Sequence, residues 1–253
     1  MKLEQTADGS YTLYVPELDE HYHSVKGALT ESKHIFIDMG LKHADATEPR
    51  ILEIGLGTGL NCFLTLMEAE ASRRKVHYTG IERFPLTLEV VRSLDYPSVI
   101  GQGHTEDYFA IHQAPWEEDV ELSPWFTLHK TEGDFTRHQF EKGYDIIYFD
   151  AFAPEKQPEM WSQPLFDILY SILNEGGILT TYCAKGVVRR MLQAAGFKVE
   201  RLPGPPGGKR EILRATKIDS VITQNNEQHH PNQRTLCRIR WQDRPQPSGP
   251  DGL

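Results

Sequence analysis

Alternation of strand-like and helix-like segments is the feature that most restricts the fold of this chain. We expect strands at 50–56, 75–82, 126–131, 144–150 and 176–183, with helices at 59–70, 85–94 and 186–195 among them. The segment at 144–150 runs apolar without alternation from Ile146 to Phe149, which is typical of a strand buried on both faces. Strands that alternate with helices form a mainly parallel sheet covered on both sides. The sequence therefore predicts an α/β fold.

Segments outside this alternation indicate the domain organisation. Residues 1–48 contain an expected hairpin at 10–24 and an expected helix at 29–39, which would form a small N-terminal attachment. Residues 49–217 would form the α/β domain, which ends in an antiparallel edge hairpin around the Pro/Gly loop of "RLPGPPGGKRE". Residues 218–253 are rich in Asn, Gln, His and Pro, and we expect this tail to be largely disordered. The stretch 98–125 reads as an insertion of no assignable structure.

Composition restricts the location and the partners. A chain of 253 residues with 39% hydrophobic residues can bury one sizeable α/β core. It contains no apolar run of about eighteen residues and begins with the polar stretch "MKLEQTADGS", so we expect a cytoplasmic protein without a membrane partner. Cys62, Cys183 and Cys237 share no metal-ligand spacing, so we expect no metal. The net charge of −9 disfavours indiscriminate binding to polyanions, so any nucleic acid would need a local basic patch.

The segment "ILEIGLGTGLN" at 51–61 predicts a ligand-binding loop. A strand would end in Gly55, Gly57 and Gly59 and lead directly into a helix, so that a ligand could approach the backbone without meeting a Cβ atom. A dinucleotide fingerprint would require Gly or Ala at position 60, where this chain has Leu60. The pattern therefore favours S-adenosylmethionine over NAD, although a glycine-rich turn without a ligand stays an alternative.

Two acidic residues would lie at the same edge of the sheet as this loop. Glu82 ends the next expected strand, about 25 residues after the glycines, where a carboxylate can accept hydrogen bonds from ribose hydroxyls. Asp134 follows another apolar strand in "TEGDF" and would bind the adenine amino group. A simple strand-end Glu and a turn Asp are the structural alternatives.

The order of these elements resembles the class I S-adenosylmethionine-dependent methyltransferases over residues 50–217. The resemblance implies a Rossmann-like fold with a mainly parallel seven-stranded sheet and an antiparallel edge hairpin. In members that methylate amines, a strand ends in Asp or Asn before a turn that contains Pro and an aromatic residue. Asp150-Ala151-Phe152-Ala153-Pro154 matches that turn and would line the place where donor and acceptor nitrogen meet. An Asp150 that only caps a helix or forms a turn is the alternative.

A closer resemblance is to the tRNA methyltransferase family that forms the N-terminal half of bifunctional MnmC proteins. It rests on "LDEHYHS", "ESKHIFI", "IGLGTGLN", "IERFPLT", "YFDAFAPEKQPEMW" and "GGKREIL". The resemblance implies methyl transfer from S-adenosylmethionine to the amine of 5-aminomethyl-(2-thio)uridine at the wobble position in the tRNA anticodon region. The sequence ends at Leu253 without a flavin-binding GxGxxG, so we expect neither bound FAD nor oxidase activity. A monomer is the default expectation.

The resemblance and the residue patterns together name the candidate site residues. The candidate catalytic residues are Asp150, Phe152 and Pro154. The candidate cofactor-binding residues are Tyr22, Glu53, Gly55, Gly57, Thr58, Gly59, Asn61, Glu82, Arg83, Asp134 and Asp150. The candidate RNA-binding residues are Lys185, Arg189, Lys209 and Arg210, for which a solvated helix face and an edge hairpin are the plainer explanation.

Two other functions stay open. An aminopropyltransferase of the spermidine synthase type also uses a GxGxG loop, but a second catalytic acid would be expected shortly after Asp150, where this chain has Ala, Phe, Ala and Pro. A non-catalytic RNA-binding module with the same fold is the second possibility, because a fold alone does not establish chemistry.

Overall fold

The structure is a computed structural model that describes residues 1–101 and 103–218. Its N-terminal part contains β1 (Lys2–Gln5), β2 (Tyr11–Val15), β3 (Glu20–His21), α1 (Ala28–Ser32) and the π-helix η1 (Lys33–Leu41). The α/β part contains β4 (Arg50–Ile54), α2 (Leu60–Ser72), β5 (Val76–Glu82), α3 (Leu88–Leu94), α4 (Tyr96–Ile100), α5 (Thr105–Gln113), β6 (Asp119–Ser123), β7 (Phe126–Glu132), β8 (Tyr144–Phe149), the 3₁₀ turn η2 (Pro158–Met160), α6 (Gln163–Ile172), β9 (Leu173–Thr181), α7 (Gly186–Ala195), β10 (Phe197–Pro203) and β11 (Glu211–Lys217).

An eight-stranded sheet forms the centre of the α/β part, with the strand order β10-β11-β9-β8-β4-β5-β7-β6. The neighbouring pairs from β9 to β7 are parallel, whereas β10, β11 and β6 run antiparallel to their neighbours. The mainly parallel α/β sheet and the antiparallel edge hairpin confirm the predicted fold class. The sheet has one strand more than expected, because β6 comes from the insertion at 98–125 and pairs only along the edge of β7.

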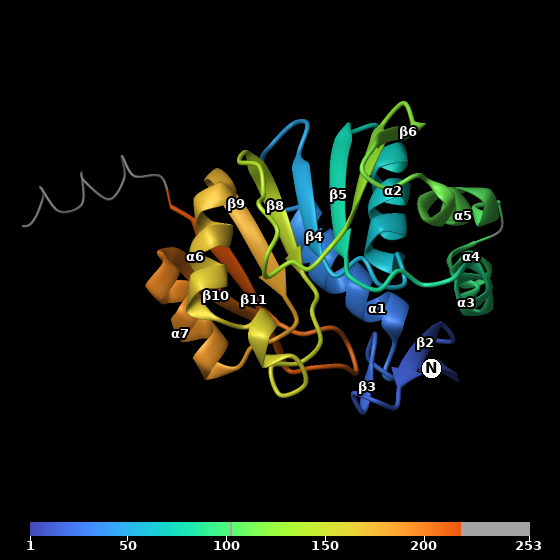
Figure 1. The fold of residues 1–253 in the computed structure, drawn as a ribbon, viewed down its shortest axis with the longest axis horizontal. Helices are drawn as coiled ribbons and strands as arrows, with labels where there is room; N and C mark the ends of the chain where they lie inside the picture. Colours follow the sequence, from blue (N-terminus) through green and yellow to red (C-terminus); the bar gives the residue numbers. More distant parts are fainter. Residues whose placement is uncertain (102, 219–253) are drawn as a thin grey trace, which may run out of the picture. The chain divides into compact units, whose positions relative to one another are not determined.

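The two faces of the sheet are covered by different helices (Figure 1). On one face, Ile146 and Tyr148 of β8 belong to the core cluster that includes side chains of η1, α2, α3 and α5. On the other face, Ile147 and Phe149 pack with α6 and α7. All four side chains are fully buried, which explains why this strand carries no polar alternation.

The N-terminal attachment consists of a small sheet and a helical segment. The expected hairpin corresponds to β2 and β3, and β1 adds a third strand to it. The expected helix at 29–39 begins as α1 but continues as the π-helix η1, which places Ile35, Phe36 and Ile37 in the core. This attachment packs on the face of the sheet that α2 also covers.

The described residues contain no helix that combines the length and the apolar character needed to cross a bilayer. Most of the predicted tail at 218–253, together with Cys237, lies outside the described residues.

The packing of α6 leads to a stability prediction. Phe166 is fully buried, and its ring centroid lies 5.4 Å from that of Phe149. Phe166→Ala should lower the free energy of unfolding by about 3–5 kcal/mol, because it removes apolar contacts and leaves a cavity. Ile168→Ala on the same helix is the matched control, since Ile168 is 42% exposed and should change stability by about 0.5 kcal/mol or less. Urea denaturation measures both, and equal losses would contradict the prediction.

Candidate functional site

A cavity of about 730 Å³ lies at the carboxyl ends of the parallel strands. Segments far apart in the sequence line it: the N-terminal hairpin and α1, the glycine loop after β4, and the residues that follow β5, β7, β8 and β9. The loop between β10 and β11 contributes Lys209. Ligands of open parallel sheets bind outside the carboxyl ends of the strands, so this cavity is the candidate site.

The glycine loop lines the cavity, and two of its glycines have little room for a side chain. Gly55 and Gly57 have φ angles of 87° and 49°, a region that favours glycine. A Cβ atom on Gly55 would lie 3.2 Å from the carbonyl oxygen of Asp150, and one on Gly57 would lie 3.1 Å from the ring of Tyr22. The loop is therefore enclosed by the turn after β8 on one side and by the N-terminal hairpin on the other.

Thr58 of this loop contacts two buried side chains. Its Oγ1 atom lies 2.7 Å from Nε2 of His23, and its carbonyl oxygen accepts a hydrogen bond of 2.8 Å from the Tyr108 hydroxyl. Burial lowers the pKa of His23 to about 4, so the imidazole is neutral at pH 7. His23 was not predicted, although it follows Tyr22 directly in "LDEHYHS"; only the tertiary contact with Thr58 reveals its role.

Glu82 joins the glycine loop to the end of β5. Its carboxylate accepts hydrogen bonds from the backbone N–H groups of Gly57, at 2.9 Å, and Phe84, at 2.8 Å. A carboxylate has about four acceptor sites, so two remain for ligand hydroxyls. Glu82, which we predicted to bind ribose hydroxyls, and the adjacent Arg83, a candidate cofactor-binding residue, both line the cavity.

Asp134 lies at the same end of the cavity as Glu82 and Arg83. It accepts hydrogen bonds from the Thr136 hydroxyl at 2.7 Å and from the Thr136 backbone N–H at 2.9 Å, and it forms an ion pair of 3.2 Å with Arg83. The Thr136 hydroxyl bond is the main reason why the pKa of Asp134 lies below its ordinary value. Asp134 is therefore an ionised acceptor at this end of the cavity.

Asp150 lies at the opposite side of the glycine loop and is joined to a buried polar chain. Its Oδ2 atom accepts a hydrogen bond of 2.8 Å from Asn61, and the same Asn61 amide donates 2.9 Å to Glu53. Tyr78 donates a third bond, of 2.7 Å, to Glu53. Burial raises the pKa of Asp150 to about 7, while the Asn61 hydrogen bond lowers it. Asp150 can therefore exchange a proton near neutral pH.

Glu53, a candidate cofactor-binding residue, lies outside the cavity lining. It is fully buried, and the cavity lining contains Asn61 but not Glu53. Burial raises the pKa of Glu53 well above its ordinary value. Glu53 thus supports Asn61 from the core and has no direct access to a ligand, because Asn61 lies between it and Asp150.

Aromatic side chains enclose the space beside Asp150. The ring of Phe152 lies 5.1 Å from that of Tyr22 in an edge-on arrangement, which brings the turn after β8 against the N-terminal hairpin. Pro154 lines the same side of the cavity. Burial raises the pKa of Tyr22 to about 12, so its hydroxyl is neutral. Tyr22, Phe152 and Pro154 can exclude water from the reacting atoms.

Only two of the four candidate RNA-binding residues line the cavity. Lys209 lines the cavity, where its Nζ atom lies 3.3 Å from Glu31. Lys185 forms an ion pair with Glu155 at the cavity edge, before α7. Arg189 lies on α7, and Arg210 is exposed beyond the cavity lining. Lys185 and Lys209 therefore both line the cavity, whereas Arg189 and Arg210 lie outside its lining.

One family model and several curated relatives match this chain. Residues 113–218 match the family described as S-adenosyl-L-methionine-dependent methyltransferase. The chain is 33% identical over 218 residues to the tRNA 5-methylaminomethyl-2-thiouridine biosynthesis bifunctional protein MnmC of Cupriavidus metallidurans, a match that covers 79% of this chain and 32% of that protein. The MnmC of Pseudomonas fluorescens is 34% identical over 211 residues, covering 78% and 32%. The chain thus spans about a third of the length of these relatives.

Solved structures are similar over most of the described chain. The crystal structure of MNMC2 from Aquifex aeolicus matches with a TM-score of 0.70 and 27% identity, covering 86% of this chain and 71% of that one. Spermidine synthase from Thermotoga maritima matches with a TM-score of 0.53 and 16% identity, covering 87% and 73%, which shows a shared fold alone.

The burial of Asp150 leads to a prediction about pH. A carboxyl group whose pKa is raised by folding favours the folded state when protonated, so its contribution to stability is lost as the pH rises from about 4 through about 7. Asp150→Asn, which carries no charge, should raise the free energy of unfolding relative to wild type by about 1–3 kcal/mol at pH 8.5 and by little at pH 4.5. Urea denaturation at both pH values measures the difference. A gain that is the same at both pH values would contradict a raised pKa.

Proposed function

We propose that this MnmC-like S-adenosylmethionine-dependent methyltransferase transfers a methyl group to the amine of 5-aminomethyl-(2-thio)uridine at the wobble position of tRNA. The observation that carries the proposal is the placement of Asp150 and its aromatic turn at one end of a cavity whose other end presents Glu82 and Asp134. One end suits an amine that must lose a proton, and the other suits the hydroxyl and amino groups of an adenosine. The printed names of the MnmC relatives support the choice of uridine and tRNA.

The residues of the cavity fit S-adenosylmethionine. Glu82 would hold the ribose hydroxyls, Asp134 and Arg83 would lie at the adenine, and Gly55 to Gly59 would leave room for the methionine part. The sulfonium of the bound cofactor supplies an electrophilic methyl group. Tyr22 and Phe152, whose rings meet across the cavity, would cover the donor and the acceptor.

Asp150 handles the proton of the acceptor. An alkylamine with a pKa near 10.4 is neutral in only about one molecule in a few thousand at pH 7, and only the neutral form can attack. In the transfer, the nitrogen lone pair forms the new N–C bond, the C–S bond breaks with its electrons left on sulfur, and the nitrogen releases one proton. A carboxylate with a pKa of about 7 can accept that proton and return it to solvent.

The adenosine end provides a test of cofactor binding. Glu82→Ala should weaken S-adenosylmethionine about ten- to a hundredfold, because a charged acceptor of two hydroxyls is lost together with a support of Gly57. Titration calorimetry measures the affinity. Glu89→Ala is the control, since Glu89 is exposed on α3 and outside the cavity lining. Wild-type affinity in Glu82→Ala would remove Glu82 from the site.

The acceptor is tested on intact tRNA. The protein and S-adenosylmethionine are incubated with one tRNA pool that carries 5-aminomethyluridine and another that carries 5-carboxymethylaminomethyluridine, and the wobble nucleosides are analysed by mass spectrometry. We expect one added methyl group in the first pool only. No gain in either pool would overturn the proposed function, while one added methyl group in the second pool would mean that the secondary amine of that nucleoside is also an acceptor.

A further inference from the structure

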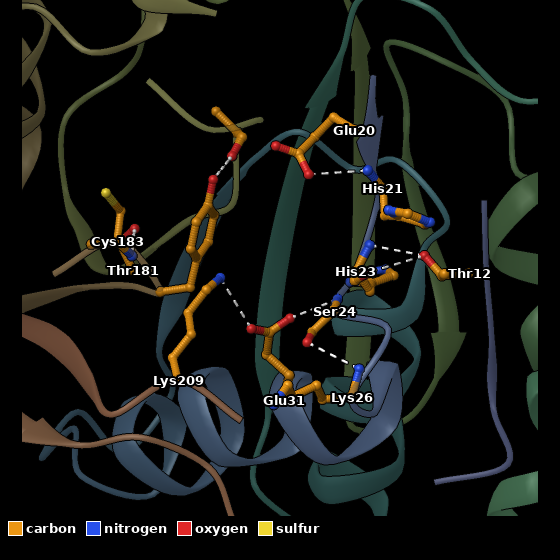
Figure 2. A network of polar contacts seen from close by, with 12 residues as sticks. Thr12, Glu20, His21, His23, Ser24, Lys26, Glu31, Thr181, Cys183 and Lys209 are labelled. Atoms are coloured by element: carbon orange, nitrogen blue, oxygen red, sulfur yellow. Dashed lines mark hydrogen bonds and ion pairs between the residues drawn. The ribbon is translucent and has the colours of Figure 1, made fainter. Parts of the chain in front are cut away.

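A lysine ammonium group lies inside the candidate site and is held there from two sides. The Nζ atom of Lys209 lies 3.3 Å from Oε1 of Glu31 and 3.7 Å from the ring centroid of Tyr182. The second carboxylate oxygen of Glu31 accepts the Ser24 backbone N–H at 3.0 Å, so Glu31 is itself held in place (Figure 2). A carboxylate and an aromatic face are the two groups that best orient an ammonium ion.

This ammonium group lies close to the turn that carries Asp150. The Tyr182 hydroxyl donates a hydrogen bond of 2.8 Å to the carbonyl oxygen of Ala151, the residue after Asp150. The same Tyr182 ring contacts the Lys209 ammonium group, so one side chain joins Lys209 to this turn. Lys209, Glu31, Tyr182 and Asp150 all line the same cavity. The positive charge of Lys209 acts on Asp150 and lowers its pKa, against the larger effect of burial.

Other contacts hold the loop that carries Lys209. The Gly204 backbone N–H donates to the Arg210 carbonyl at 2.9 Å, and a ring nitrogen of His34 lies 2.8 Å from the Pro203 carbonyl oxygen. These contacts hold the loop without the side chain of Lys209. Because Lys209 lines the cavity, a role limited to binding RNA phosphates does not account for its position.

We propose that Lys209 is a positioning residue of the methyl-transfer site, whose ammonium group, held by Glu31 and the Tyr182 ring, offsets the negative charge of Glu31 beside Asp150 and disfavours the ammonium form of the acceptor amine. The inference rests on the proposed function. A neighbouring cation disfavours a second positive charge, so an amine beside Lys209 loses its proton more readily. The same cation favours the carboxylate form of Asp150, which then accepts the proton released during transfer.

Charges from each neighbouring element act on this pair. Glu31 of α1 opposes Lys209, because its negative charge raises the pKa of Asp150, and this effect is larger than that of Lys209. Burial disfavours the charged form of five neighbouring groups: Glu53 on β4, Tyr22 and His23 after β3, and Tyr182 and Cys183 after β9. Charged side chains that line the same cavity from neighbouring elements include Glu20 on β3, Lys185 before α7 and Glu211 on β11; Lys185 pairs with Glu155, and Glu211 pairs with Arg201.

The test is the pH profile of kcat on tRNA that carries 5-aminomethyluridine, at saturating S-adenosylmethionine. The acid limb of kcat reports groups in the enzyme–substrate complex. Lys209→Met should move this limb upward by about 0.5–1 pH unit, since Lys209 is partly exposed and its field is screened. At pH 7 the rate should fall about three- to tenfold, and near pH 9.5 it should approach the wild-type rate. Lys209→Arg, which keeps the charge, should restore the wild-type limb.

A matched control lies at the far end of β11, the strand that follows the loop of Lys209. Lys217 of β11 also contacts an aromatic ring and a carboxylate, with its Nζ atom 5.0 Å from the Tyr170 ring centroid and 3.7 Å from Glu175. It lies outside the cavity lining. Lys217→Met should therefore leave the acid limb at its wild-type pH.

Several results would overturn the inference. These are a loss by the same factor at every pH, a Lys209→Arg profile equal to that of Lys209→Met, a change in KM alone, and a loss of S-adenosylmethionine affinity in Lys209→Met. Each would assign Lys209 to loop anchoring, RNA binding or cofactor binding. If the wild-type protein methylates no tRNA pool, the proposed function fails and the inference fails with it; active wild type with an unshifted Lys209→Met profile overturns the inference alone.

Discussion

The buried hydrogen-bonded chain from Tyr78 through Glu53 and Asn61 to Asp150 is the interaction on which the geometry of the site depends. A fully buried carboxyl group costs several kcal/mol unless its oxygens are paired, so Glu53 needs both Tyr78 and Asn61 in place. This requirement fixes the start of α2 relative to β4 and β5. The side-chain amide of Asn61 then also donates a hydrogen bond to Asp150. The glycine loop connects β4 to α2 beside this hydrogen bond.

The walls around this centre come from both ends of the described chain. Tyr22 of the N-terminal hairpin packs over Gly57 and meets Phe152, while Glu31 of α1 pairs with Lys209, 178 residues later. A site enclosed in this way contains less water, so each charge acts more strongly on its neighbours. The small N-terminal attachment and the edge hairpin are thus parts of the site, and the sheet supplies the frame that brings them together.

The fold was predictable from sequence wherever the signal is local. The expected strands and helices of the α/β part match β4, α2, β5, α3, β7, β8, β9 and α7 closely, because strand burial and helix periodicity are properties of neighbouring residues. β6 was missed because Asp119–Ser123 is a short and largely polar edge strand that becomes a strand only through pairing with β7. The π-helical winding of η1 likewise has no pattern of its own in the sequence.

For the candidate site, the sequence by itself determined which residues end the strands: the glycine loop, Glu82, Asp134 and Asp150. Parallel strands place their carboxyl ends at one edge, so these positions converge in any such fold. Only the tertiary structure decided that Glu53 is buried behind Asn61, that His23 supports Thr58, and that Lys209 points into the cavity. Each of these depends on contacts between segments far apart in the chain, and the direction of a long side chain at a loop is set by its partners, which no local pattern encodes.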